Sequence, residues 1–163
     1  MKTKYLAISL FLVALVGCAT PQPATRTVIE KSRVFDAPYD KVWAAIISGV
    51  AESNLPITTL EKDSGLIAIT NAAYEPGWAE EGVRGSVLGT PDMVMERVAN
   101  FNIFAVAESS VQTRVQVNSD MKMHVRRGNG SDALPFIYQW QPSFSNGQLE
   151  RLILDGIARR NPQ

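Results

Sequence analysis

The sequence contains few of the residues from which most catalytic and metal sites are built. Among its 163 residues there is one Cys, Cys18, and one His, His124. A single Cys excludes a disulfide framework, a zinc site made of several cysteines and a two-Cys redox motif within the chain. Sixteen basic residues balance sixteen acidic ones, so no overall basic field indicates a nucleic-acid partner. We therefore expect no nucleic-acid partner, and no cofactor or metal.

A hydrophobic run long enough to cross a membrane is also missing at the N-terminus. The apolar stretch at residues 6–16 is interrupted by Ser9 and is shorter than the ~20 residues that a spanning helix needs. It follows Lys2 and Lys4, and a positive start before a short apolar stretch is typical of a secretory signal peptide. We expect residues 1–17 to be such a peptide.

The only Cys ends this stretch, in the sequence LVGC at positions 15–18. These four residues resemble the lipobox of bacterial lipoproteins: an aliphatic residue, a small or aliphatic one, Gly or Ala, and then Cys. The resemblance implies cleavage before Cys18, lipidation of its thiol and acylation of the new amine. Residue 19 is Ala rather than the Asp that favours inner-membrane retention in enterobacterial lipoproteins, which implies an anchor at the periplasmic face of the outer membrane. The alternative is a buried Cys at the end of an ordinary apolar helix.

Residues 18–26 follow as the lipidated Cys and a flexible tether, because Pro21 and Pro23 block a helix and nothing in this segment can form a core. The remaining residues, 27–161, have the length of a single domain.

Periodic patterns predict the elements of this domain. Residues 27–35 read as a strand, and a helix is predicted to start at Pro38 and to end at Asn54 and Pro56. Two short β-rich runs, 57–60 and 66–70, flank the turn sequence KDSG and predict a hairpin. The helix carries an apolar stripe at helical spacing, on which Trp43 is expected to be a core residue: Tyr39, Val42, Trp43, Ile46 and Val50.

Two long strands are predicted next, at residues 94–107 and 111–125. In the second, apolar residues from Val111 to Val125 alternate with polar ones, so one face is expected to be buried and the other wet, as in an antiparallel sheet. A short strand at 136–141 precedes a helix with Ser145 and Gln148 as a capping box. The apolar stripe of that helix consists of Leu149, Leu152, Ile153 and Ile157. The order predicts an α+β domain, an antiparallel sheet with two helices on one face.

This order resembles the helix-grip architecture. The sequence VFDAPYDKVWAAI at positions 34–46 is similar to its strand-to-helix start, and LEKDSGLIAIT at 60–70 is similar to the hairpin that follows in BamC-type lipoproteins. The closing SNGQLERLILDGI fits the last helix. The resemblance covers roughly residues 30–70 and 143–158; BamC-type lipoproteins are accessory parts of the outer-membrane barrel assembly machine and have a longer chain with two such domains, whereas this chain has room for one.

No catalytic motif stands out. His124 and Asp120 share the polar face of one strand about 13 Å apart, and Ser119 faces the other way, so they make no triad. We expect His124 to be a solvated surface residue. The glycine-rich segment 72–92 is the best candidate for function, because Tyr74, Trp78 and Arg84 are residue types that often anchor protein interfaces. The alternative is that Trp78 only packs this segment onto the sheet.

We therefore expect a non-catalytic interaction or scaffolding module of the cell envelope, with a partner protein bound through Tyr74, Trp78 and Arg84. The alternative is a carrier of an apolar ligand, held in a cavity between the sheet and the last helix. The bulky side chains of Phe101, Ile103, Met121 and Met123 favour a filled core instead. A hydrolase is a third alternative, without a motif to support it.

Overall fold

Residues 28–80, 86–87 and 90–161 are described in the computed structural model, and they form an antiparallel sheet with two helices. The predicted α+β class is confirmed. The predicted signal peptide, Cys18 and Arg84 lie outside the described residues. The elements are β1 (Ser32–Phe35), α1 (Tyr39–Glu52), β2 (Ile57–Glu61), β3 (Leu66–Ala73), the 3-10 turn η1 (Pro76–Trp78), β4 (Ala79–Glu80), β5 (Ser86–Val87), β6 (Thr90–Pro91), β7 (Met93–Ala107), β8 (Thr113–Arg127), β9 (Ile137–Ser145) and α2 (Gln148–Arg160).

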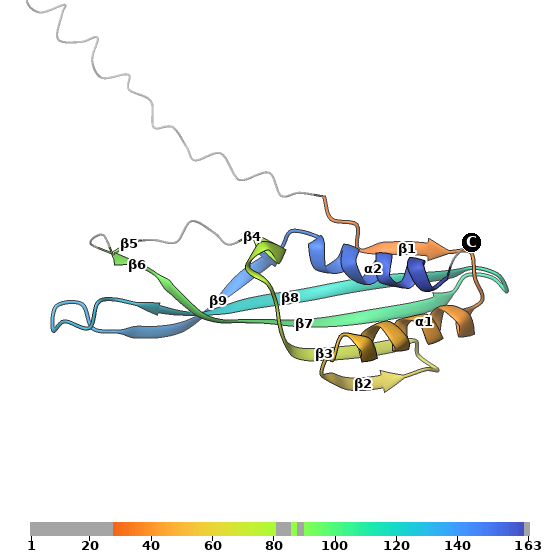
Figure 1. Ribbon diagram of the computed structural model, residues 1–163, viewed down its shortest axis with the longest axis horizontal. Helices are drawn as coiled ribbons and strands as arrows, with labels where there is room; N and C mark the ends of the chain where they lie inside the picture. The colour runs from red at the N-terminus through yellow and green to blue at the C-terminus, as the bar shows by residue number, and fades with distance from the viewer. Residues whose placement is uncertain (1–27, 81–85, 88–89, 162–163) are drawn as a thin grey trace, which may run out of the picture.

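The main sheet has seven strands in the order β2-β3-β7-β8-β9-β4, with β1 paired to β8. β1 and β9 share one edge of β8, since β1 pairs with its first residues and β9 with its last. Helices α1 and α2 contact each other and lie on the same face of the sheet, over β7 and β8 (Figure 1). The start of β7, the end of β8 and the start of β9 pair with one another, and this part of the sheet projects beyond the helices (Figure 1). None of the helices in the described residues is long and apolar enough to cross a membrane.

Helix α1 begins after Pro38, whose fixed φ suits a helix start, and Asp40 lies in the first turn where the helix dipole favours an acid. Its apolar stripe faces the sheet, and Trp43 is buried as predicted. Trp43 stacks on Tyr39 with ring centroids 5.9 Å apart. The hydroxyl of Tyr39 donates to the carbonyl of Lys62, so the start of α1 is joined to the turn between β2 and β3.

The predicted β2–β3 hairpin is confirmed, and its turn depends on Gly65. This residue has a φ of +70°, and a Cβ there would lie 2.0 Å from the carbonyl oxygen of Ala105. The Gly65 carbonyl also accepts a hydrogen bond from the Ala105 N–H at 2.9 Å. Only glycine allows this left-handed conformation together with so close a backbone approach.

The long strands β7 and β8 pair over almost their whole length. Thr113, Val115 and Val117 are completely buried, whereas Arg114 and Gln116 between them are exposed, so the predicted alternation is confirmed. Val111 is an exception, because it precedes β8 and is exposed. The bulky residues expected to fill the core are all buried: Phe101, Ile103, Met121 and Met123.

The first strand is shorter than the predicted 27–35, because β1 begins at Ser32.

The prediction that residues 72–92 lack regular structure is wrong in part. β3 extends to Ala73 past a bulge between Ile69 and Ala72, where Asn71 has a φ of +56°. η1 and β4 follow, and Ala79 pairs with Ser145 of β9. Backbone pairing to neighbouring strands thus gives regular structure to a segment whose composition favours loops.

The predicted capping box of the last helix is also wrong. Ser145 ends β9, which is longer than the predicted strand, and Gly147 is the N-cap of α2 with a φ of +89°. The stripe differs as well, because Leu152 is 45% exposed while Leu154 is completely buried. A chain reversal through a left-handed glycine moves the helix start by two residues and rotates its buried face.

Candidate functional site

A groove of about 400 Å³ lies between α1 and α2, and its wall is mostly apolar. Ile103 of β7, Ala73 of β3 and Trp78 of η1 line it together with residues of both helices. Leu152, on the exposed side of α2, presents a large apolar side chain to it. The helix residues are Ile46, Gly49, Val50 and Ser53 from α1, Leu55 beyond it, and Leu149, Leu152, Ile153, Gly156, Ile157, Arg159 and Arg160 from α2.

Two glycines make room for an arginine where the helices approach. A Cβ added to Gly49 would lie 3.6 Å from Nη1 of Arg160, and one added to Gly156 would lie 3.5 Å from the same atom. That nitrogen donates to the Gly156 carbonyl at 2.9 Å, while Nη2 of Arg160 pairs with Glu52 of α1. Arg160 therefore joins the C-terminal ends of both helices through its guanidinium.

Arg159 is the other cation at this end of the groove. It is exposed and makes no ion pair with any residue that the structure describes. The groove thus combines an apolar wall with a guanidinium that no described residue pairs, an arrangement that suits an apolar group carrying a negative charge.

Trp78, the central residue of the predicted interface, lines this groove. Its side chain is half-buried and packs against the core. The contact with the core fits the packing alternative, and the exposed part of the side chain fits the interface hypothesis. The backbone around it is fixed, since the Asn146 N–H donates to the Trp78 carbonyl at 3.1 Å and Asn146 Nδ2 donates to the Gly77 carbonyl at 2.6 Å. These bonds hold η1 against the start of α2.

Tyr74 does not belong to an exposed surface. It is only 6% exposed and lies in the main core cluster, and its hydroxyl has no hydrogen-bond partner among the described residues. Of the predicted set, Tyr74 is therefore a core residue and Trp78 lines the groove, while Arg84 lies outside the described residues.

A buried carboxylate near the groove was missed from the sequence. Glu150 is completely buried, and its two oxygens accept hydrogen bonds of 2.6 Å from Ser119 of β8 and Ser145 of β9. The signal that could have located it is the inward parity of Ser119 and Ser145 on paired strands, which places two hydroxyls under the last helix. Glu150 sits in the first turn of α2, where the helix dipole also favours its charge.

An ion pair also fixes α2 to strand β1. Arg33 of β1 donates to Asp155 of α2 at 2.8 Å and to Glu30 through its other nitrogens. These donated hydrogen bonds hold the pKa of Glu30 below its usual value and raise that of Arg33. The contacts of Arg33 and Glu150 together seat α2 on one side of the groove.

His124 lies on the face of β8 opposite the helices, as its parity predicts. It is half-buried rather than fully solvated, because its ring stacks on Trp140 of β9 with centroids 4.9 Å apart. The described residues contain no group of three or more His, Cys, Asp or Glu side chains placed to hold a metal ion.

Comparison with known proteins gives no match, either to a protein-family model or to a curated protein.

Proposed function

We propose that this protein is a lipid-anchored, non-catalytic interaction module at the periplasmic face of the outer membrane. In this proposal Cys18 carries the anchor, and the groove between α1 and α2 binds an apolar segment of an envelope partner. The observation that carries the proposal is the groove itself, an apolar wall with Leu152 exposed and, at one end, Arg159 without an ion pair to any described residue.

The charge at the groove supports a proposal for the chemistry of the partner segment. Arg160 is already engaged by Glu52 and by the Gly156 carbonyl, whereas Arg159 has no ion pair within the part of the chain that the structure describes. An apolar side chain could occupy the space beside Trp78 and Leu152 while a carboxylate pairs with Arg159. We therefore propose a segment with an apolar anchor followed by an acidic residue or a C-terminal carboxylate.

The test is a crosslinked pull-down from intact envelopes with four proteins: wild type, Leu152→Asp, Arg159→Glu and the matched control Leu60→Asp. Leu60 is 52% exposed on β2, outside the groove, so its variant places the same charge on an unrelated surface. We expect one crosslinked species to be lost in the two groove variants and kept in the control. Equal recovery from all four proteins would contradict the proposal.

The alternative function is a carrier of an apolar ligand, and the volume of the groove is compatible with this function. About 400 Å³ lies within the range of small-molecule sites. Native mass spectrometry of the purified domain distinguishes the two functions, because a carrier is expected to retain a lipid in a fixed ratio. A stoichiometric lipid that Leu152→Asp releases would favour the carrier over the protein partner.

A further inference from the structure

We propose that the projecting ends of β7, β8 and β9 form a second interaction surface, which docks onto a phospholipid bilayer. It lies outside the groove, so it goes beyond the function proposed above. We define the tip surface by six residues: Met93 of β7, Lys122 and Arg126 of β8, Phe136 just before β9, and Tyr138 and Trp140 of β9.

The register places these side chains on the face of the sheet opposite the helices. His124 pairs with Trp140, and Arg126 lies between Met93 and Tyr138 in the paired strands. Their neighbours of opposite parity, Met123 and Val125, are buried. A column of basic residues on β8 therefore runs beside a column of aromatic residues on β9.

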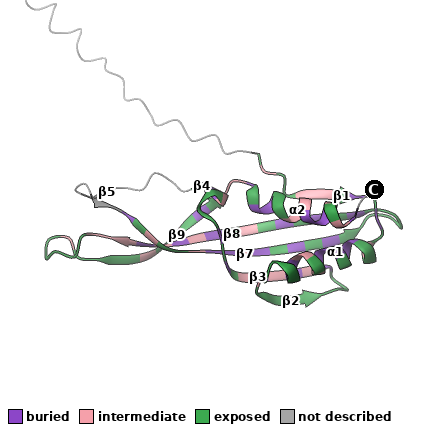
Figure 2. Cartoon of the chain, viewed as in Figure 1, coloured by how far each residue is buried: buried purple, intermediate pink, exposed green. Residues whose placement is uncertain are grey.

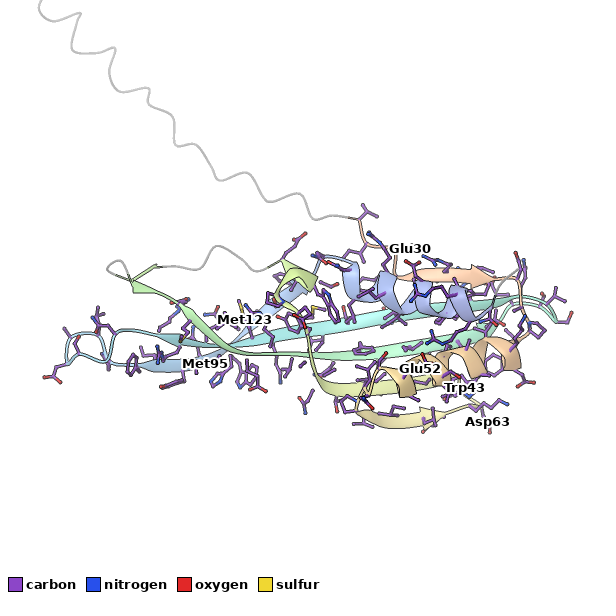
Figure 3. The ribbon with its side chains drawn as sticks, viewed as in Figure 1. Glu30, Trp43, Glu52, Asp63, Met95 and Met123 are labelled. Atoms are coloured by element: carbon purple, nitrogen blue, oxygen red, sulfur yellow. The ribbon has the colours of Figure 1, made fainter. Side chains whose placement is uncertain are left out.

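This part of the sheet extends beyond the helices, and much of it is exposed (Figure 2). Met95 and Met123, labelled in Figure 3, mark the region where the strands leave the helix layer. Four large apolar residues of the tip surface are exposed by nearly half or more: Met93 51%, Phe136 44%, Tyr138 55% and Trp140 47%. So many large exposed side chains at one end of a molecule indicate an interaction surface.

The contacts within the tip surface favour a lipid over a stacked ligand. The ammonium of Lys122 lies 4.9 Å from the ring centre of Trp140, which also stacks on His124, and the guanidinium of Arg126 lies 4.6 Å from the ring centre of Phe136. These rings already contact their own neighbours, so they are poor free platforms for bases or sugars. Phe136 and Trp140 nevertheless remain nearly half exposed, which suits a less specific apolar environment.

The combination of residue types matches a membrane interface. Trp and Tyr concentrate at the level of the lipid headgroups, long basic side chains reach the phosphates, and aliphatic residues enter the acyl region. Nucleic-acid binding would leave Met93 without a role. Acidic side chains on the same face, Glu96 opposite His124 and the exposed Asp120, limit the net positive charge, so we expect insertion of apolar groups as well as attraction to anionic lipid.

The proposed anchor would bring the bilayer within reach. Cys18 precedes the first described residue, Val28, by a segment that spans at most about 35 Å when extended. A surface held this close has a high effective concentration, so even weak docking would orient the domain. This proximity rests on the proposed anchor, but the tip surface itself does not, and the test therefore uses a protein without Cys18 and its acyl chains.

The experiment uses residues 19–163, which retain the whole core cluster from Phe35 to Ile157, with vesicles of phosphatidylcholine and phosphatidylglycerol. Lys122→Glu with Arg126→Glu is compared with the control Lys41→Glu with Arg151→Glu, whose residues are exposed on the helices. We expect the tip variant to bind more than about tenfold more weakly in co-sedimentation and the control to bind like wild type. Lys122→Gln with Arg126→Gln, whose unchanged fold is checked by circular dichroism, is expected to bind the vesicles with intermediate affinity.

Insertion is measured separately with brominated lipids, which quench nearby tryptophans. We expect quenching in wild type and its loss in Trp140→Phe, since Trp43 is buried and Trp78 lies in the groove. Absence of vesicle binding, equal weakening by both charge variants, or binding without quenching of Trp140 would each overturn the proposal. Leu152→Asp is expected to bind vesicles like wild type, so failure of the groove proposal would leave this one standing.

Discussion

The hydroxyl of Ser119 donates a 2.6 Å hydrogen bond to Oε1 of Glu150, a residue 31 positions later in the chain. Ser145 donates to the other carboxylate oxygen, and its own oxygen accepts from the N–H of Gly147. Central strand β8, strand β9 and the first turn of α2 therefore meet at one buried carboxylate. Because α2 forms one wall of the groove, the position of that wall depends on this contact.

Replacing Glu150 tests this dependence. Glu150→Ala leaves a cavity and two hydroxyls without their acceptor, and we expect a loss of about 3 kcal/mol of unfolding free energy. Glu150→Gln keeps the volume and one acceptor oxygen, so its loss should be about 1 kcal/mol. Urea unfolding measures both, with the exposed Glu75→Gln as a control within about 0.5 kcal/mol of wild type. Equal losses for Ala and Gln would contradict the account of this contact.

For Tyr74 we expect the opposite result, because removing its polar group should not destabilise the protein. Its ring is buried while its hydroxyl has no partner among the described residues, and an unpaired buried hydroxyl is unfavourable. We expect Tyr74→Phe to be as stable as wild type or to gain up to about 1 kcal/mol, whereas Tyr74→Ala should lose about 3–5 kcal/mol. Thermal unfolding of the three proteins checks the order. A clear destabilisation by Tyr74→Phe would show that the hydroxyl has a partner.

From the pKa of Tyr39 we expect the protein to lose stability at alkaline pH. Burial raises the pKa of Tyr39 above its ordinary value of 10.0, so the folded state holds this proton more tightly than the unfolded chain does. The resulting stability is complete below that ordinary value and is lost as the pH rises through the higher pKa of the folded state.

We expect Tyr39→Phe to show a flatter decline of the urea midpoint from about pH 9 to about pH 11. The difference between the two proteins at neutral pH reports the lost hydrogen bond to the Lys62 carbonyl, and only the slope reports ionisation. The raised pKa of Lys62, caused mainly by its hydrogen bond with Asp40, adds a decline that both proteins share. Identical slopes would refute the role of Tyr39.

The anchor is tested by labelling with palmitate in a Gram-negative host that expresses the full chain. We expect wild type to be labelled and to fractionate with the outer membrane, because residues 15–18 resemble a lipobox. Cys18→Ser removes the only thiol, so it should be unlabelled. Labelling of that variant, or a wild-type protein that remains in the soluble periplasmic fraction, would contradict the proposed anchor.

Much of the fold could be predicted because its signals are local. The alternation along β8 and the stripe of α1 each obey one simple period within about fifteen residues, and the turn at Gly65 is marked by its own residue types. The α2 start could not be predicted, because Ser145 resembles an N-cap in sequence and is instead held in β9 by pairing with Ala79. That pairing is a long-range contact, which no local pattern encodes.

The candidate site was less predictable from the sequence than the fold, because more of it is built from long-range contacts. Trp78 was found through its residue type. Tyr74, only four positions earlier, is in the core because the bulge between Ile69 and Ala72 changes which residues of the strand face inward. Gly49 and Gly156 are separated by most of the domain, and their meeting around Arg160 follows from helix packing. The aromatic residues of β9 were likewise inconspicuous until the register placed them beside the basic residues of β8.

The central claim is that the groove between α1 and α2 binds a partner protein, and a photo-crosslinking residue placed at Leu152 tests it most directly. Leu152 is exposed and lines the groove, while Leu60 is similarly exposed on β2 and serves as the control position. In intact cells, we predict one discrete crosslinked protein from position 152, absent from position 60 and abolished by Arg159→Glu. No crosslink from position 152, or the same crosslinks from both positions, would contradict the claim.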